Sequence, residues 1–378
     1  MRHRNKKSNK FVFSPLGLQY LYRQLNISRM KKLKLTLSMC MSLLGFTSCN
    51  CSNWADLNPD EFYEAISSAG TCVIDVRTPQ EYAEGHLLNA INIDWQKDGF
   101  IGEISKKIDK SIRLAIYCRS GRRSAAAAQA LSDAGYKVVN LKEGYQSWTA
   151  SGKPVNTYEV EFFMDGSDPV VITLIKHGTL AVFYKGAYIH FDPVGGYGKA
   201  TDYATEFPKA DAVLVTHEHG DHLDKNAITT LSSDKTILLL NAKSQGQIGM
   251  GKSIANFEKA DLPQGIRLDV VPAYNTTPGR EQFHPENNGN GYVLTFPNGF
   301  RLYVAGDTED IPEMADIKNI DVAFLPVNQP YTMTVEQCVK AANIIKPKVL
   351  IPYHFSQTDL NGLPALLPDI DVRLRNMQ

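Results

Sequence analysis

Short apolar runs alternate with helix-like segments between residues 54 and 153. Residues 59–69 follow Asn58, a favourable helix N-cap with proline at the first helical position, and residues 124–134 are rich in alanine. The apolar runs have the length of buried strands: residues 71–76, 114–117 and 138–141. Alternating strands and helices predict an α/β domain with a parallel sheet and helices on both of its faces.

A further apolar run, residues 212–215, predicts a buried strand and is followed by the sequence His-Glu-His-Gly-Asp-His at residues 217–222. In extended backbone, His217 and His219 point to the same side, so both imidazoles can reach one ion. Gly220 allows a bend, after which Asp221 and His222 point toward a second ion. Since each ion needs three or four ligands, distant residues must complete the two sites.

The N-terminus has the pattern of a secretory signal. Basic residues at 31–34 precede an apolar stretch, residues 35–46, and the small residues that end at Cys49. This resembles the lipobox of bacterial lipoproteins, which implies a lipid anchor on Cys49 and a location on the periplasmic side of the cell envelope. We therefore expect residues 1–51 to be a leader. Residues 1–29 are either sequence upstream of a true start at Met30 or a genuine basic extension.

Composition adds two restrictions. The 40 acidic and 40 basic side chains of the 378 residues cancel, so no overall field favours nucleic acid as a partner. The six cysteines do not form a disulfide framework, and we expect Cys72 and Cys338 to be inert core thiols.

Cys118 has the surroundings of a reactive thiol. It ends the predicted strand 114–117, and the sequence Arg119-Ser120-Gly121-Arg122-Arg123 leads from it into the alanine-rich helix. The helix N-terminus and three arginines favour the thiolate form. The same loop would bind an anion such as thiosulfate.

These residues resemble the rhodanese family over a domain that we place at residues 52–154. The resemblance implies that Cys118 takes a sulfane sulfur as a persulfide, that Arg119, Arg122 and Arg123 bind the donor, and that Asp75 and Arg77 support the loop. Four residues separate Cys118 from Arg123, as in sulfur-transferring rhodaneses. The matching segments are Asp75-Val76-Arg77, Glu81-Tyr82, Gly85-His86-Leu87, the loop 118–123 and residues 141–148.

The remainder, residues 158–378, resembles the metallo-β-lactamase superfamily of metal-dependent hydrolases, most closely its L-ascorbate-6-phosphate lactonase-like branch. The resemblance implies an αββα sandwich. The segments that carry it are His177-Gly178-Thr179, Asp192-Pro193, the motif 217–222, His284, Ala305-Gly306-Asp307-Thr308, Tyr331-Thr332-Met333-Thr334 and Pro352-Tyr353-His354.

The resemblance also implies a ligand set for two ions. His217, His219 and His284 would hold the first ion, and Asp307 would bridge to the second. The second ion's own ligands would be Asp221, His222 and His354. Asp192 would orient a ligand histidine, whereas His177 and Tyr331 are candidates for substrate contact or for packing. Five histidines and two carboxylates suit zinc best, although manganese or iron would also fit.

The sequence thus predicts a hydrolase that uses hydroxide formed on two ions, fused to a sulfurtransferase, with a small-molecule substrate and a sulfane-sulfur donor. One alternative is a persulfide dioxygenase-like iron enzyme. Those enzymes place a histidine after the glycine where this chain has Gly279-Arg280, and the retained His222 and His354 favour the hydrolase. Another alternative is an envelope module that only carries or binds sulfur.

Overall fold

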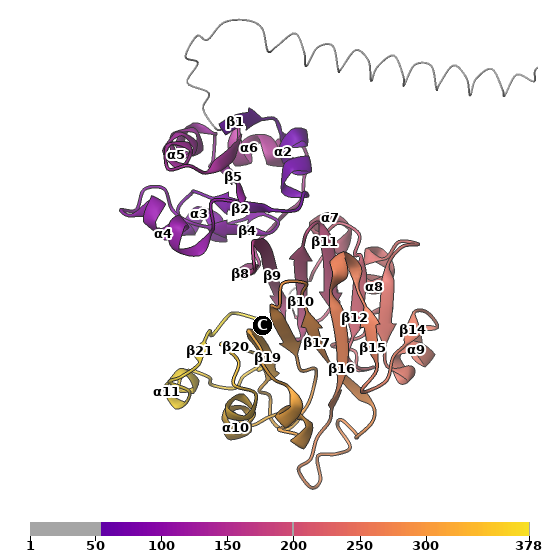
Figure 1. Cartoon of the computed structure of the whole chain (residues 1–378). Coiled ribbons are helices and arrows are strands. Elements are labelled where there is room, and N and C mark those ends of the chain that lie inside the picture. The colour runs from indigo at the N-terminus through magenta and orange to yellow at the C-terminus, as the bar shows by residue number, and fades with distance from the viewer. Residues whose placement is uncertain (1–53, 199, 378) are drawn as a thin grey trace, which may run out of the picture. The chain divides into compact units, whose positions relative to one another are not determined.

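The protein is described here by a computed structural model that covers residues 54–198 and 200–377 (Figure 1). The predicted leader, including Cys49, lies outside the described residues. Among the residues that are described, no helix is both long and apolar enough to cross a membrane.

The N-terminal domain is built on a five-stranded sheet of order β1-β6-β5-β2-β4, in which every pair of neighbours is parallel. A separate antiparallel pair joins β3 to β7. The elements in chain order are β1 (Trp54–Leu57), α2 (Pro59–Ile66), β2 (Thr71–Asp75), α3 (Pro79–Ala83), β3 (His86–Leu87), β4 (Ala90–Asn92), α4 (Phe100–Lys107), β5 (Arg113–Tyr117), α5 (Arg122–Asp133), β6 (Lys137–Leu141), α6 (Gly144–Ala150) and β7 (Val155–Asn156).

Helices cover both faces of this sheet, as the alternation predicts. Phe62 of α2 and Trp148 of α6 pack on one face, with Ala115 of β5. Ile104 of α4 and Leu131 of α5 pack in the cluster on the other face. Strands that are buried on both sides lack a polar alternation, which is why the sequence shows them as continuous apolar runs.

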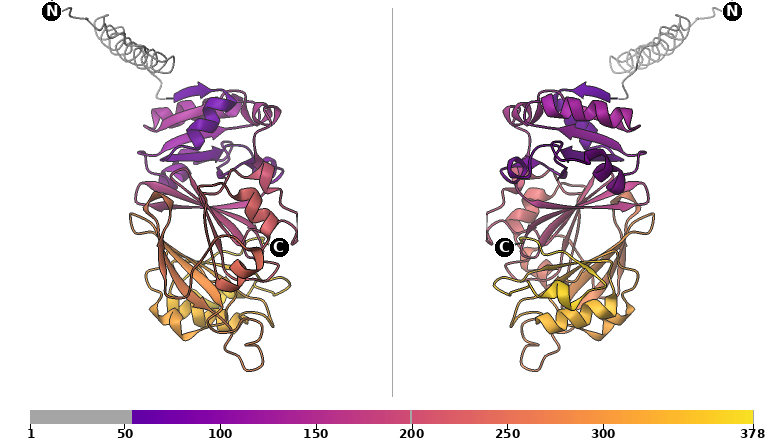
Figure 2. Two further views of the ribbon diagram at one scale, coloured as in Figure 1. Left: turned by 90° about the vertical axis from the view of Figure 1, so that its right-hand side faces the viewer. Right: turned by 90° about the vertical axis from the view of Figure 1, so that its left-hand side faces the viewer.

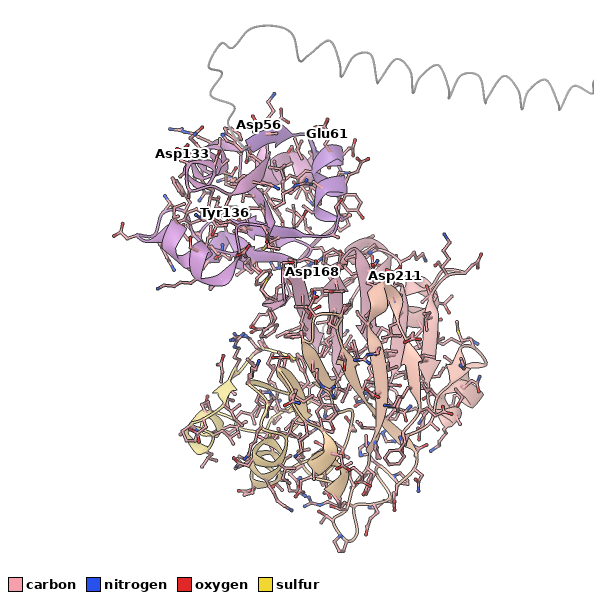
Figure 3. All side chains as sticks on the ribbon, viewed as in Figure 1. Asp56, Glu61, Asp133, Tyr136, Asp168 and Asp211 are labelled. Atoms are coloured by element: carbon pink, nitrogen blue, oxygen red, sulfur yellow. The ribbon has the colours of Figure 1, made fainter. Side chains whose placement is uncertain are left out.

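Local side-chain chemistry sets the ends of these helices. Asn58 accepts hydrogen bonds from the backbone N–H groups of residues 60 and 61 and thereby begins α2. The helix ends at Ile66, three residues before the predicted end, where the hydroxyls of Ser67 and Ser68 donate to helix carbonyls. Near the start of β6, the Tyr136 hydroxyl (Figure 3) donates to the Ile108 carbonyl at 3.1 Å and ties the end of α4 to the sheet.

The C-terminal domain contains two seven-stranded sheets. The elements of its first half are β8 (Glu159–Asp165), β9 (Asp168–Lys176), β10 (Thr179–Tyr184), β11 (Ala187–Phe191), α7 (Tyr203–Glu206), β12 (Ala212–Val215), α8 (Lys225–Leu231), β13 (Ile237–Leu240), α9 (Ala242–Ile248) and β14 (Lys252–Ser253). The elements of its second half are β15 (Lys259–Asp261), η1 (Pro263–Gly265), β16 (Arg267–Ala273), β17 (Gly289–Thr295), β18 (Arg301–Val304), η2 (Pro312–Asp316), β19 (Val322–Pro326), α10 (Val335–Ile345), β20 (Val349–Tyr353), α11 (Leu363–Leu366) and β21 (Asp371–Val372).

The two sheets repeat one pairing pattern. In the first, β8 to β11 pair antiparallel and β11 to β14 pair parallel. In the second, β15 to β18 pair antiparallel and β18 to β21 pair parallel. Each sheet therefore has a parallel half whose strand ends can present side chains at a common edge.

The layers of this domain form the αββα sandwich. Inward-facing residues of both sheets, such as Leu214 and Leu294, share one core, whereas Val213 packs under α8 and Leu325 packs under α10. In Figure 1, α8 and α9 lie on one side of the paired sheets, and α10 and α11 lie on the other. Figure 2 views the chain from those two sides.

Candidate functional site

The residues predicted to bind metal converge at the ends of parallel strands in the C-terminal domain. The histidine-rich loop follows β12, Asp307 follows β18, and His354 follows β20. His284 lies in the loop between β16 and β17. Strand ends at one edge bring together side chains that are far apart in the sequence, and the fold therefore assembles the site.

The donor atoms form three overlapping groups. Within each group the ligand atoms lie within 4.8 Å of one another. The first group contains the histidines assigned to the first ion. The second contains the ligands assigned to the second ion, together with His177. The groups are His217, His219 and His284; His177, Asp221, His222 and His354; and His217, His222 and Asp307.

Asp307 lies between the two predicted ion positions. One carboxylate oxygen is 3.3 Å from Nε2 of His222, and the other is 3.3 Å from Nε2 of His284 and 3.2 Å from Nε2 of His354. It therefore contacts histidines of both predicted sets, which is the arrangement that a bridging carboxylate requires.

Neighbouring polar groups fix which nitrogen of His217, His222 and His284 faces the site. Asp192 accepts from the Thr216 hydroxyl and from Nδ1–H of His222, each at 2.7 Å. The Thr216 oxygen lies 3.0 Å from Nδ1 of His217, and the Nδ1 of His284 lies 3.1 Å from the Tyr331 carbonyl. With protons held at Nδ1, the Nε2 lone pairs point toward the site.

Buried donor atoms that have no hydrogen-bond partner test whether a metal ion fits this site. Among the described residues, four buried atoms at this position have no hydrogen-bond partner: Nε2 of His222, Nε2 of His284, Nε2 of His354 and Oδ1 of Asp307. A buried polar atom without a partner costs about 1–3 kcal/mol. Metal coordination would satisfy all four, so the residues present fit a two-ion centre.

Two groups already have the ionisation state that metal binding requires. Burial lowers the pKa of His217 well below the ordinary histidine value, which keeps the imidazole neutral. Burial opposes the charge of Asp307, but the nearby His222 and His354 outweigh it and hold the pKa of this carboxyl well below its usual range. Neutral imidazole and ionised carboxylate are the forms that coordinate metals. At His222 and His354, burial opposes charge but the Asp307 carboxylate outweighs it and raises the pKa, well above the ordinary value for His222 and to about 9 for His354, so a metal ion would displace protons from these two imidazoles.

His177 lies closer to the centre than its assignment to substrate contact or packing requires. It occupies the turn between β9 and β10 with a φ of 42°, and its Nε2 lies 3.2 Å from Oδ2 of Asp221. Its ring stacks on that of His354, with centroids 3.7 Å apart. The sequence marks it only by the segment His177-Gly178-Thr179 and gave no reason to place it among the metal donors.

A cavity of about 680 Å³ opens over this centre. Tyr331, one of the predicted substrate contacts, lines it and is 47% exposed. The predicted metal ligands His219, Asp221, His284, Asp307 and His354 also line it, whereas the other residues of the wall were missed because nothing in the local pattern distinguishes them. The residues that line the cavity are Tyr197, His219, Asp221, Phe283, His284, Asp307, Asn328, Gln329, Tyr331, His354, Ser356, Gln357 and Thr358.

The second functional region is the cysteine loop between β5 and α5. Cys118 is 1% exposed, and Ser124 Oγ donates to its sulfur at 3.4 Å. Arg119 and Arg122 are exposed. Arg123 instead makes two hydrogen bonds to the Glu81 carboxylate, at 2.6 and 2.8 Å. Arg119 and Arg122 thus extend toward solvent, while Arg123 is held at the side of the loop.

Close backbone packing holds the loop in shape. The Tyr145 N–H donates to the Cys118 carbonyl at 2.8 Å. Gly121 has a φ of 82°, and a Cβ there would lie 1.7 Å from the Lys142 carbonyl oxygen, so no other residue fits. The Arg77 guanidinium, paired with buried Asp75, lies 4.2 Å from the Tyr145 ring centroid and packs behind the loop.

Comparisons with known proteins agree with both regions. Residues 58–151 match the rhodanese-like domain, and residues 171–354 match a β-lactamase superfamily domain. A UPF0173 metal-dependent hydrolase of Koribacter versatilis is 32% identical over 208 residues, which cover 52% of this chain and 89% of the relative. A UPF0173 metal-dependent hydrolase of a Geobacillus species is 28% identical over 226 residues, covering 52% of this chain and 93% of the relative. A solved structure from Parabacteroides distasonis, considered to be a metal-dependent hydrolase, is 49% identical with a TM-score of 0.56, and the match covers 58% of this chain and all of that one.

Proposed function

Because the chain belongs to the metal-dependent hydrolases of the metallo-β-lactamase superfamily and carries a rhodanese domain, we propose that it is a two-domain enzyme. The C-terminal domain hydrolyses a small molecule at a centre of two zinc ions. His217, His219 and His284 hold one ion, and Asp307 is shared. Asp221, His222 and His354 hold the other.

The convergence of buried lone pairs without partners on both sides of Asp307 is the observation that carries this proposal. When bound, two divalent cations lower the pKa of water toward neutrality and stabilise the oxyanion that forms at the attacked centre. Asp192 and Thr216 keep His222 and His217 in the required tautomer. His177, in the turn between β9 and β10, lies 3.2 Å from Asp221 and would help to position that carboxylate.

Metal content tests this part. Purified protein should bind two zinc equivalents by elemental analysis, and Asp307→Ala should lose most of both because it removes the shared ligand. A single iron with oxygen uptake would instead support the dioxygenase-like enzyme.

For the N-terminal domain we propose sulfur transfer through Cys118. The Cys118 thiolate attacks the outer sulfur of thiosulfate, a sulfur–sulfur bond forms, and sulfite leaves with the electron pair of the broken bond. An acceptor such as cyanide then takes the outer sulfur as thiocyanate and restores the thiolate. Arg119 and Arg122, the exposed cations of the loop, attract the anionic donor.

Thiocyanate formation from thiosulfate and cyanide measures this activity. Cys118→Ser should abolish it, whereas Cys72→Ala, a change at another buried thiol of the same domain, should retain it in the folded protein. Equal rates in Cys118→Ser and wild type would contradict the proposal and favour a module that only binds sulfur compounds.

We also propose a bacterial envelope location, with Cys49 lipidated and the domains on the periplasmic side. The support is the basic and apolar pattern before Cys49. Mass spectrometry of the mature N-terminus in a bacterial host should find a diacylglyceryl-modified Cys49, and an unprocessed N-terminus would oppose this location.

A further inference from the structure

Among the described residues, the wall of the cavity over the candidate metal centre carries no lysine or arginine and is partly aromatic. From it we infer that the hydrolysed substrate is an uncharged acyl compound, such as a lactone, ester or thioester with an apolar group beside the scissile bond. This inference rests on the proposed hydrolase function. It adds the substrate class and separates acyl hydrolysis from the hydrolysis of phosphate esters.

The first support is the charge of the side chains that line the cavity. Among the described residues that line the cavity, no side chain is lysine or arginine, and the two carboxylates, Asp221 and Asp307, are predicted metal ligands. Lys199 lies outside the described residues. Arginine, lysine and helix N-termini are common protein partners of phosphate groups. The described wall offers an anionic substrate none of the cationic side chains.

Nearby cations are engaged elsewhere. Arg280, in the same loop as Phe283, lies 3.7 Å from buried Glu309. Lys340, on α10, pairs with Asp310 at 2.5 Å. Neither is among the residues that line the cavity.

The second support is the aromatic content. Four large apolar side chains remain exposed among the described residues, and two of them, Tyr197 and Tyr331, line this cavity at 43% and 47% exposure. Phe283 packs edge-on against Tyr331, with ring centroids 5.1 Å apart. Tyr197 lies over His177, with centroids 4.5 Å apart. These contacts hold the rings at the entrance, where they would cover an apolar group of the substrate.

The third support is a group of neutral polar side chains on one side of the cavity. Asn328, Ser356 and Gln357 line the cavity near His354, and Asn328 Nδ2 donates to Ser356 Oγ at 3.2 Å. Amide and hydroxyl groups can orient a carbonyl or ring oxygen without requiring charge on the ligand. In the reaction, water adds to the acyl carbon, the bond from that carbon to oxygen or sulfur breaks, and the leaving group takes a proton from water.

Matched chromogenic probes test the inference with the full chain loaded with zinc. We expect kcat/KM for 4-nitrophenyl butyrate to exceed that for 4-nitrophenyl phosphate and bis(4-nitrophenyl) phosphate by at least about 100-fold, the order of discrimination that a mismatched buried group imposes. Inorganic phosphate should inhibit only weakly.

A charge-introducing variant makes the test specific for the wall. Tyr331→Lys should lower KM for 4-nitrophenyl phosphate about two- to fivefold, as expected when one charge–charge contact is added at a partly exposed site. Phe257→Lys, at an exposed aromatic residue outside the cavity, should not change it.

The outcomes test the acyl inference and the hydrolase proposal separately. Preferred hydrolysis of a phosphate probe overturns the acyl inference but leaves the hydrolase proposal unaffected. A protein that binds two zinc ions yet hydrolyses none of the three probes contradicts the hydrolase itself. An unchanged KM in Tyr331→Lys would show that the aromatic wall does not face the substrate.

Discussion

Asp192 offers a sensitive test of how the metal centre is held, because it contacts no predicted ion position directly. It is fully buried after β11, where it accepts hydrogen bonds from the Thr216 N–H, the Thr216 hydroxyl and Nδ1–H of His222, each at 2.7 Å. Its φ of 44° is tolerated by asparagine as well as by aspartate. Asp192→Asn therefore changes the hydrogen-bond chemistry while it preserves size and backbone.

The substitution should act through the tautomer of His222. The asparagine oxygen can still accept from the Thr216 N–H, but its amide group then faces Nδ1 of His222 with a donor. His222 must present a lone pair at Nδ1 and carry its proton at Nε2, the atom that the ion requires. Loss of such an orienting partner typically weakens metal affinity by about 10- to 100-fold, or about 1.4–2.7 kcal/mol.

Zinc titration against a competing fluorescent chelator, with unfolding followed in parallel, would measure this effect. Asp165→Asn is a matched control, since Asp165 is also fully buried and accepts from the Tyr184 hydroxyl and two backbone N–H groups. It should lower stability without changing zinc affinity. If Asp192→Asn binds two zinc ions as tightly as wild type, then the ligand tautomer is not set by Asp192 and the reasoning is wrong.

Three further outcomes can be read from unfolding experiments. Burial lowers the pKa of His190 to about 3, so between pH 6.5 and 3 this side chain takes up a proton only in the unfolded chain. The free energy of unfolding should therefore fall by about 2 kcal/mol between pH 7.5 and 5, and His190→Leu should show a smaller fall over the same interval. Hydrogen bonds from Arg123 lower the pKa of Glu81 to about 2. The ionised carboxylate therefore stabilises the fold above the unfolded pKa near 4.5, and this stabilisation is lost as the pH falls toward 2. Between pH 6 and 3, the free energy of unfolding of wild type should fall by about 1 kcal/mol more than that of Glu81→Gln, after allowance for the partial exposure of the pair. Glu309→Ala removes the acceptor of the backbone N–H groups of residues 276 and 277, in the loop that leads to the proposed ligand His284. Urea titration should show that the free energy of unfolding falls by about 2–4 kcal/mol.

Much of the fold follows from the apolar pattern. The predicted strands at 71–76, 114–117 and 138–141 appear as β2, β5 and β6, shifted by one residue at most, because strands buried on both faces must be apolar throughout. The short β4 and the two-residue strands β3 and β7 were not predicted. Their pairing depends on the sheet already being present, so local sequence carries little signal for them.

The candidate metal ligands could be predicted from the sequence for a different reason. Metal ligands are restricted to a few residue types, and the motif 217–222 provides four of them directly after a strand. The fold then brings Asp307 and His354 to the same edge through parallel strand ends. The cavity wall had no such restriction, since asparagine, glutamine and tyrosine are common in loops. Tyr331 was noted only through a resemblance to a known family.

His177 shows most clearly what the sequence could not reveal. Its N–H donates to the Met377 carbonyl at 2.5 Å, and its own carbonyl accepts from the His354 N–H at 3.2 Å. Its place beside Asp221 thus depends on three segments that are far apart in the chain and meet only in the folded domain. Neither spacing nor residue type near position 177 contains that information, because a histidine in a tight turn after a strand is equally compatible with packing. The place of His177 beside Asp221 is therefore a consequence of tertiary structure.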